Sequence, residues 1–72
     1  MKVEAPWPGV VQEIMVAVGD VIEVDQEIVT IESMKMLTPV ASPLAGRVVE
    51  IHVEIGGYVD EGAPLLTLES GD

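Results

Sequence analysis

The sequence predicts an all-β fold, a flattened β-barrel or sandwich of about eight short strands with internal pseudo-two-fold symmetry. Three observations lead to this prediction. Val, Ile and Leu dominate the hydrophobic residues and Phe is absent, short apolar runs end at turn signals, and the chain repeats itself. No segment combines apolar residues at helical spacing with capping residues, so we expect no helix. With 72 residues and no cysteine, the chain is expected to form one domain over residues 1–72 without disulfides.

The repeat relates residues that lie 37 positions apart, and it needs no gap. Ten of the 28 positions from Pro6 to Ser33 are identical to their mates, which is too many for composition alone. The identical pairs are Pro6/Pro43, Gly9/Gly46, Val11/Val48, Glu13/Glu50, Ile14/Ile51, Val16/Val53, Gly19/Gly56, Thr30/Thr67, Glu32/Glu69 and Ser33/Ser70. Two copies are too few for a solenoid, so we expect them to pack against each other about a pseudo-two-fold axis.

Each copy is predicted to contain a strand, a turn, a short strand, a turn and a further strand. In the first copy, residues 9–18 are rich in strand formers and end at the turn signal Gly19-Asp20. Residues 21–24 form the short strand, Asp25-Gln26 the polar turn and residues 28–31 the last strand. The second copy repeats this order, with strands over residues 46–55, 58–59 and 65–68 and turns at Gly56-Gly57 and Glu61-Gly62.

The repeat also makes predictions about two single residues. Asp25 is the mate of Gly62, so if this turn needs a left-handed backbone, aspartate replaces glycine at a small cost in stability. The mate of Lys35 is Asp72, the last residue, so the axis places the turn around Lys35 opposite the chain termini. We therefore expect Lys35 on the exposed tip of a hairpin at one end of the domain.

Two methionines flank this lysine in the segment Glu32-Ser33-Met34-Lys35-Met36. Lysines in turns are usually solvated charges, and methionines usually fill cores. A two-residue turn, however, cannot bury both Met34 and Met36 beside an exposed Lys35. Their adaptable apolar side chains are therefore expected to form a contact surface for a partner.

This segment resembles the attachment motif of biotinyl domains, in which glutamate, a small residue and Met-Lys-Met surround the modified lysine. Residues 5–11 (APWPGVV) resemble the opening of these domains, and residues 42–48 (SPLAGRV) resemble the start of their second half. The resemblance covers essentially the whole chain. It implies covalent attachment of biotin to Lys35, with Met34 and Met36 as flanking recognition residues and Glu32 in recognition by the ligase.

The chain departs from the biotinyl pattern at several positions. Ser33 stands where alanine is usual, Leu37 where an acidic residue is common, and Trp7 where methionine is common. We expect Trp7 to pack over the open end of the sandwich, while Glu32 is equally well explained as a solvated charge at a strand end. The gapless repeat leaves no room for the protruding thumb of many acetyl-CoA carboxylase carriers, which indicates a carrier of the thumbless type.

The resemblance implies a non-catalytic carrier component of a multi-component carboxylase. A biotin protein ligase would attach the biotin, which would then move between a biotin carboxylase and a carboxyltransferase. With one histidine, no cysteine and no spacing typical of metal ligands or phosphate loops, the chain itself offers no catalytic site and no metal site. His52, the mate of Met15, is expected to be a surface or partly packed strand residue.

Charge and hydropathy add expectations about partners and location. The net charge of −10 disfavours nucleic acid and anionic membranes as partners, and it suits solubility first and docking onto basic surfaces second. No apolar run is long enough to span a bilayer and no signal region is present, so we expect a cytoplasmic domain that is monomeric when isolated. The absence of an Ala/Pro-rich linker before Val3 favours a short free-standing subunit.

Two alternatives remain open. A lipoyl domain of a 2-oxo acid dehydrogenase-type complex shares the expected fold and tip lysine, and some small attachment proteins accept both cofactors. Because lipoyl domains typically present Asp-Lys-Ala-like residues, Met34 and Met36 favour biotin. The other alternative is an unmodified interaction module, which would keep its binding after Lys35→Ala, whereas a carrier would lose all function.

Overall fold

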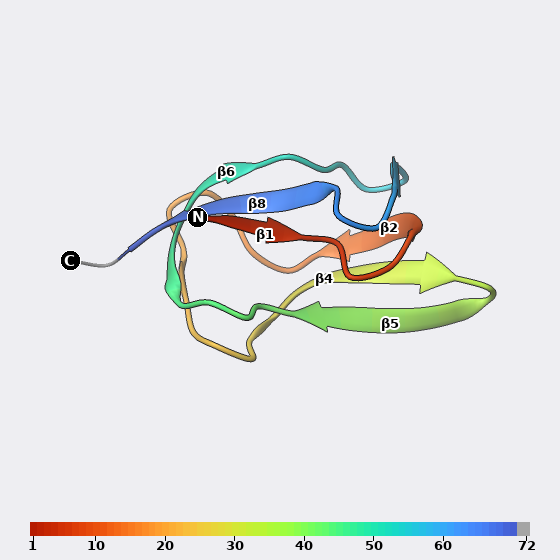
Figure 1. Ribbon diagram of the computed structural model, residues 1–72, viewed down its shortest axis with the longest axis horizontal. Coiled ribbons are helices and arrows are strands. Elements are labelled where there is room, and N and C mark those ends of the chain that lie inside the picture. The colour runs from red at the N-terminus through yellow and green to blue at the C-terminus, as the bar shows by residue number, and fades with distance from the viewer. Residues whose placement is uncertain (71–72) are drawn as a thin grey trace.

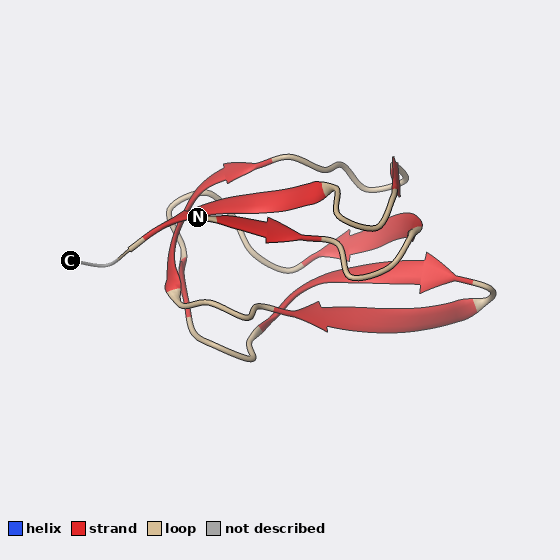
Figure 2. Cartoon of the chain, viewed as in Figure 1, coloured by secondary structure: helices blue, strands red, loops and turns tan. Residues whose placement is uncertain are grey.

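The computed structural model describes residues 1–70, which form eight strands and no helix. The strands are β1 (Lys2–Glu4), β2 (Gly9–Ile14), β3 (Val21–Ile22), β4 (Glu27–Ser33), β5 (Met36–Ala41), β6 (Gly46–Ile51), β7 (Tyr58–Val59) and β8 (Pro64–Glu69). Figure 2 shows these strands joined by loops alone. The predicted all-β fold is therefore confirmed. Residues 1–70 contain no helix that is long and apolar enough to cross a membrane.

The strands form two four-stranded antiparallel sheets, with the orders β1-β8-β6-β3 and β5-β4-β2-β7 (Figure 1). We call them sheet A and sheet B. The two sheets pack face to face in a body of 39 × 19 × 18 Å. Because the two sheets remain separate, the predicted flattened sandwich is confirmed. The strands do not close into a barrel.

The predicted pseudo-two-fold symmetry is present at the level of strand register. A shift of 37 residues maps residues 1–33 onto residues 38–70, so that β2 corresponds to β6, β3 to β7 and β4 to β8. Val11 faces Ile31 in sheet B, and their mates Val48 and Leu68 face each other in sheet A. Both pairs of strands also have an irregularity in register directly after these residues.

The two copies are interlocked, because each contributes strands to both sheets. Sheet A contains β1 and β3 from residues 1–33 together with β6 and β8 from residues 38–70. Sheet B combines β2 and β4 with strands β5 and β7. Residues 34–37 join the two copies. Neither copy therefore forms a complete sheet without the other.

The first strand of each copy is shorter than predicted. The sequence predicts strand over residues 9–18, but β2 ends at Ile14, and β6 likewise ends at Ile51. Beyond Ile14 the chain leaves sheet B: the Met15 amide still donates to the Ile28 carbonyl, but the Gly19 amide donates to the Val48 carbonyl of sheet A. These hydrogen bonds satisfy backbone N–H groups without the regular pairing of a strand with its neighbour. The strand propensity of residues 15–18 therefore does not decide their conformation.

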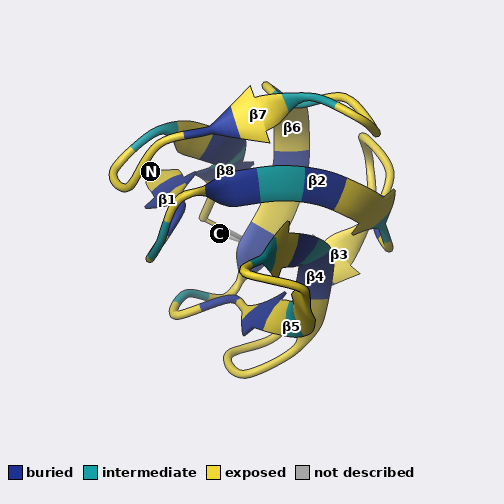
Figure 3. Ribbon diagram, turned by 90° about the vertical axis from the view of Figure 1, so that its right-hand side faces the viewer, coloured by how far each residue is buried: buried dark blue, intermediate teal, exposed yellow. Residues whose placement is uncertain are grey.

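The core between the sheets is aliphatic. Figure 3 shows that buried and exposed residues follow one another along the strands. The largest fully buried hydrophobic side chains of the core are those of Ile22, Ile28, Ile31, Leu65, Leu66, Leu68, Val3, Val11, Val29 and Val48. Gly9 lies where strands approach closely, since a Cβ atom there would be 2.5 Å from both the Glu32 carbonyl oxygen and the Ile31 Cγ2 atom. Its mate Gly46 is less confined, with 2.7 Å to the Glu69 carbonyl oxygen and 3.3 Å to Leu68 Cβ.

The backbone at Asp25 is left-handed, in keeping with its correspondence to Gly62 in the repeat. The φ angles are 71° at Asp25 and 86° at Gly62. The Asp25 amide donates to the Ser42 carbonyl at 2.7 Å, and the Gly62 amide donates to the equivalent Ala5 carbonyl at 2.8 Å. The two turns are thus built alike, and the first one carries a residue that pays a conformational penalty.

Asp25→Gly is expected to stabilise the domain by roughly 0.5–1 kcal/mol, because a left-handed backbone costs an L-residue about 1–2 kcal/mol while glycine loses more entropy on folding. Thermal unfolding should show a melting temperature higher by about 3–6 °C for a domain of this size. The reciprocal variant Gly62→Asp is the control and should be destabilised. An unchanged or lower melting temperature for Asp25→Gly would contradict this explanation.

Candidate functional site

The hairpin of β4 and β5 ends in a two-residue turn formed by Met34 and Lys35. Ser33 and Met36 are paired and close the hairpin. Both turn residues have positive φ angles, 52° at Met34 and 66° at Lys35, as a type I′ turn requires. In Figure 1 this turn lies at one end of the molecule, opposite the N-terminus and the end of β8. The predicted hairpin tip is confirmed, although Asp72, the predicted mate of Lys35, lies outside the described residues.

The side chains of the turn are exposed. Met34 is 93% exposed and Met36 is 67% exposed, and Lys35 also lies in the exposed class. Within residues 1–70, no carboxylate lies within salt-bridge distance of Lys35, and the only such contact there is between His52 and Glu50, 3.8 Å apart. Two exposed apolar side chains therefore flank an exposed lysine, and their role as a contact surface for a partner stays a prediction.

The turn does not have the sequence that its geometry favours. Type I′ turns prefer Asn-Gly, and an ordinary side chain in the left-handed region costs about 1–2 kcal/mol. Met34 and Lys35 therefore hold the tip in a strained conformation. Strain of this kind persists where a side chain is needed at a particular place.

Met34→Asn is expected to raise the stability of the domain by roughly 0.5–1 kcal/mol, because asparagine tolerates the left-handed conformation better than methionine. The midpoint of urea-induced unfolding measures this gain. Met36→Asn is the matched control, since Met36 belongs to β5 and asparagine is disfavoured in strands. If the two variants were equally stable, the strain at position 34 would not be the cause.

Glu32 lies on β4 close to the tip, and its carboxylate accepts a hydrogen bond. Gln12 Nε2 on β2 donates a hydrogen bond to Glu32 Oε1 at 3.2 Å. Gln12 is not predicted from the sequence as a partner of Glu32, although the repeat contains a signal: a polar residue stands here where its mate is the apolar Val49. The exposed Glu32 carboxylate thus has a hydrogen-bond partner on the neighbouring strand.

A row of side chains crosses the outer face of sheet B at the position of Glu32. Tyr58 pairs with Val10, Val10 pairs with Glu32, and Glu32 pairs with Leu37. Tyr58 and Leu37 are both more than half exposed. The surface near Lys35 therefore combines one carboxylate with apolar neighbours.

Trp7 lies beside the tip and also contacts the core. It is half-buried and packs against the buried core residues, as the sequence predicts. It also lines a hollow of about 310 Å³ together with Ser33, Met34, Met36 and Thr38. The sequence does not predict this hollow, because residues 7 and 38 meet the turn only through the fold.

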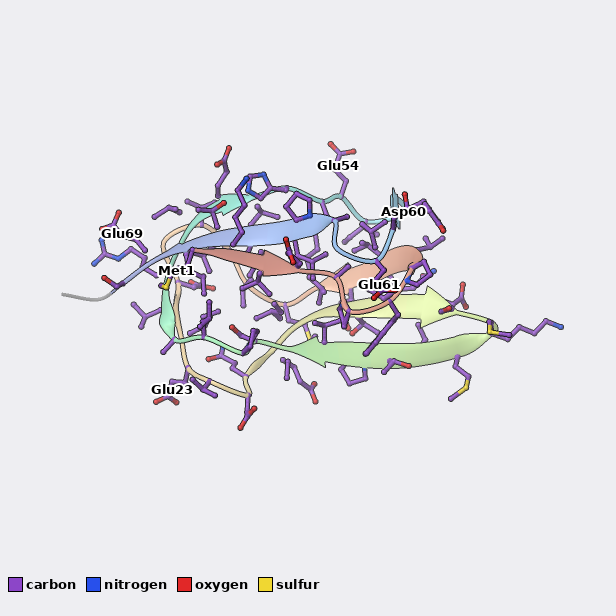
Figure 4. All side chains as sticks on the ribbon, viewed as in Figure 1. Met1, Glu23, Glu54, Asp60, Glu61 and Glu69 are labelled. Atoms are coloured by element: carbon purple, nitrogen blue, oxygen red, sulfur yellow. The ribbon has the colours of Figure 1, made fainter. Side chains whose placement is uncertain are left out.

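The remaining candidate residues lie elsewhere. His52 follows β6 in sheet A, where its Nε2 atom is 2.6 Å from Thr67 Oγ1 and 3.8 Å from Glu50 Oε1. It is a surface residue on the sheet that does not carry Lys35. Carboxylates such as Glu23, Glu54 and Glu69 point outward on different sides of the molecule (Figure 4). The negative charge is therefore spread over the surface.

The arrangement suits the attachment of an acyl group. Formation of an amide needs an amine that a second protein's active site can reach, and Lys35 is exposed in the turn between β4 and β5 without a salt-bridge partner in the described chain. Flanking apolar side chains and one hydrogen-bonded carboxylate give such a protein features to bind. The residues at the tip thus fit a covalently attached cofactor.

Comparison with known proteins agrees with this geometry. A family model described as "Biotin-requiring enzyme" (Biotin_lipoyl) matches residues 1–68. The chain is 48% identical over 60 residues to the dihydrolipoyllysine-residue acetyltransferase component of the pyruvate dehydrogenase complex of Haemophilus influenzae, covering 83% of this chain and 11% of that protein. It is 38% identical over 64 residues to the biotin carboxyl carrier protein of Streptococcus mutans, covering 89% of this chain and 49% of that protein.

The fold is shared with a solved structure as well. A single-chain, multi-domain long-chain acyl-CoA carboxylase superposes with a TM-score of 0.89 and 32% identity, covering 100% of this chain and 7% of that one. The chain thus spans half or less of the length of each of these proteins. The relatives include both a biotin carrier and a component named for dihydrolipoyllysine. The chain belongs to the biotin/lipoyl attachment family.

Proposed function

We propose that residues 1–72 form a biotin carboxyl carrier domain or subunit, with biotin attached to Lys35. The observation that carries this proposal is the exposed Met34-Lys35-Met36 segment on a type I′ turn. The similarity to the Streptococcus mutans biotin carboxyl carrier protein supports it. We further propose that the domain is monomeric and cytoplasmic and that it catalyses no step itself.

In this proposal Lys35 supplies the nucleophile and a biotin protein ligase supplies the activation. The Lys35 amine loses a proton and its nitrogen forms an amide bond with the carboxyl carbon of biotinyl-adenylate, from which AMP departs. The product has lost one positive charge, so the net charge changes from −10 to −11. Met34 and Met36 give the ligase an apolar contact, and Glu32, held by Gln12, gives it a charged one.

The carrier then works by tethering. Biotin, when attached, supplies the atom that holds a carboxyl group while the group is carried from a biotin carboxylase to a carboxyltransferase. The domain keeps this group at a high effective concentration near both partners, so that the group does not diffuse away between steps. The long axis of 39 Å ends at the lysine turn, which lets the tip enter a cleft while the rest of the domain stays outside.

A lipoyl carrier is the second candidate, and one observation favours it. The identity with the pyruvate dehydrogenase component reaches 48%, higher than the 38% with the biotin carboxyl carrier protein. Overall identity, however, reports mainly on the shared sandwich. The choice of cofactor is expected to depend on the few side chains that touch the modifying enzyme, and here these are methionines.

The test is to incubate the purified domain with a biotin protein ligase and, separately, with a lipoate ligase, followed by intact mass spectrometry and peptide mapping. The proposal expects one biotinyl group on the Lys35 peptide and little or no lipoylation. Lipoylation alone would assign the domain to the lipoyl class, and modification by both ligases would indicate dual use. No modification by either active ligase would leave only the interaction module.

Met34→Asp with Met36→Ala is expected to slow biotinylation by about 100-fold or more, because the ligase loses two apolar contacts that contribute about 1.5 kcal/mol or more each. Initial rates of biotin incorporation measure this loss. Met15→Ala, which changes a partly exposed methionine outside the tip, is the matched control and should react at the normal rate. Equal rates for both variants would remove the methionines from the recognition surface.

A further inference from the structure

The hollow beside the turn has an unusual lining for a surface so close to a lysine. Trp7, Met34 and Met36 line it with large apolar side chains, Ser33 and Thr38 provide two hydroxyl groups, and none of the five carries a charge. Within residues 1–70 neither hydroxyl forms a hydrogen bond, whereas buried Ser42 donates from its Oγ atom to the Leu44 carbonyl at 2.6 Å. The hollow therefore offers an apolar surface together with free polar groups.

Packing of the core does not explain the size of Trp7. Its mate in the repeat is Leu44, which is also half-buried and packs against the same core. An aliphatic side chain is thus sufficient to close this position of the sandwich. Trp7 therefore carries more apolar area than this position of the core requires, and it is this residue that lines the hollow next to the turn.

The position of the hollow beside Lys35 indicates which group would occupy it. Met34 and Met36 are the chain neighbours of Lys35, so whatever is attached to that lysine lies within reach of the hollow at all times. A lysine ammonium would lose hydration against these apolar walls, but acylation removes the charge. An uncharged, largely apolar acyl chain with a polar head group fits the walls and the two hydroxyls.

We propose that Trp7, Met34 and Met36 form a resting site for the acyl arm on Lys35, in which the Ser33 and Thr38 hydroxyls bind the ureido ring of biotin. This inference rests on the proposed function, because it needs biotin on Lys35. Unmodified Lys35 stays in solvent, whereas the modified side chain alternates between the hollow and a free, extended state. The arm is thus sheltered between visits to its partners and remains available to them.

The expected occupancy is intermediate. A short flexible tether produces an effective concentration in the millimolar range. An open hollow that binds the arm with a dissociation constant of about 1 mM is then filled about half of the time. The arm would rest there without being locked away.

Trp7 provides a direct readout, because it is the only tryptophan in the chain. Its fluorescence quenching by acrylamide, an uncharged quencher, is compared between unmodified domain and domain whose full biotinylation is established by mass spectrometry. The quenching constant should fall about two-fold on biotinylation, in line with half occupancy. Free biotin at the protein concentration is the control and should leave the unmodified domain unchanged.

A variant tests the same site through another signal. Trp7→Leu installs the residue of its mate Leu44, so the core remains filled while the hollow loses its indole wall. Streptavidin should capture the biotinylated variant about twice as fast as biotinylated wild type, because capture depends on the fraction of free arms. Ser33→Ala should give a smaller acceleration in the same direction.

The outcomes separate the two claims. Failure of biotinylation would contradict the proposed function and the resting site together. Complete biotinylation with unchanged quenching of Trp7, or with equal capture rates for wild type and Trp7→Leu, would overturn the resting site and leave the carrier function intact. A fall in quenching that persists in biotinylated Ser33→Ala at full size would remove the hydroxyl contact at Ser33 from the proposal.

Discussion

Lys35→Arg is expected to abolish cofactor attachment completely while leaving the fold intact. Arginine keeps the positive charge and the long aliphatic stem, and it has the same energetic cost as lysine in the left-handed conformation of the turn. Its guanidinium stays protonated and is a poor nucleophile, so no amide forms. Stability should remain within about 0.5 kcal/mol of wild type, as is usual for an exposed substitution.

Intact mass spectrometry after treatment with biotin protein ligase measures this effect, and thermal unfolding verifies the fold. Lys2→Arg is the matched control, since Lys2 is the only other lysine in the sequence and is exposed on β1, away from the turn. It should be biotinylated to the same extent as wild type. A biotinyl group on folded Lys35→Arg would place the attachment site elsewhere.

Gly9→Ala is expected to destabilise the domain by about 3 kcal/mol, at the upper end of the range for added atoms in a packed structure. The new Cβ atom would lie 2.5 Å from a backbone carbonyl oxygen and from the side chain of buried Ile31, and neither can move without disturbing β4. A domain of this size has a net stability of only about 3–5 kcal/mol. A large fraction of the variant should therefore be unfolded at physiological temperature.

Urea unfolding followed by circular dichroism measures the loss. Gly57→Ala is the control, because its nearest contact, the Glu54 carbonyl oxygen at 3.1 Å, requires a shift of only a few tenths of an ångström. Gly46→Ala should fall between the two, in keeping with its less confined position. Equal stabilities for Gly9→Ala and Gly57→Ala would show that β2 and β4 separate more easily than the structure indicates.

The internal repeat is the reason why so much of the fold can be predicted from the sequence. It correctly relates Asp25 to Gly62, whose backbones are both left-handed, and it places Lys35 on an exposed tip. A register shift of one residue would turn the buried aliphatic side chains outward. Equivalent positions of the two copies must therefore be buried alike, which is why these predictions succeed.

The rest depends on contacts that local sequence does not encode. Strand propensity continues through Val16 and Val18, yet β2 ends at Ile14, because hydrogen bonds to the other sheet replace the ladder. The hydrogen bond from Gln12 to Glu32 spans 20 residues and arises from the pairing of β2 with β4. The hollow at Trp7 likewise exists only once the N-terminal segment has folded over the inner side of the hairpin.

The interlocked arrangement of the two copies also bears on how such a site can arise. Residues 1–33 and 38–70 contribute equivalent strands with equivalent register to the two sheets, so the repeat alone makes the two ends of the sandwich equivalent. The connection between the two copies breaks that equivalence, since residues 34–37 join them as a continuous turn at one end only. Lys35 lies within this join, and residues 34 and 35 belong to no strand of either sheet. A symmetric scaffold thereby gains a single, directional appendage without giving up any of its shared packing.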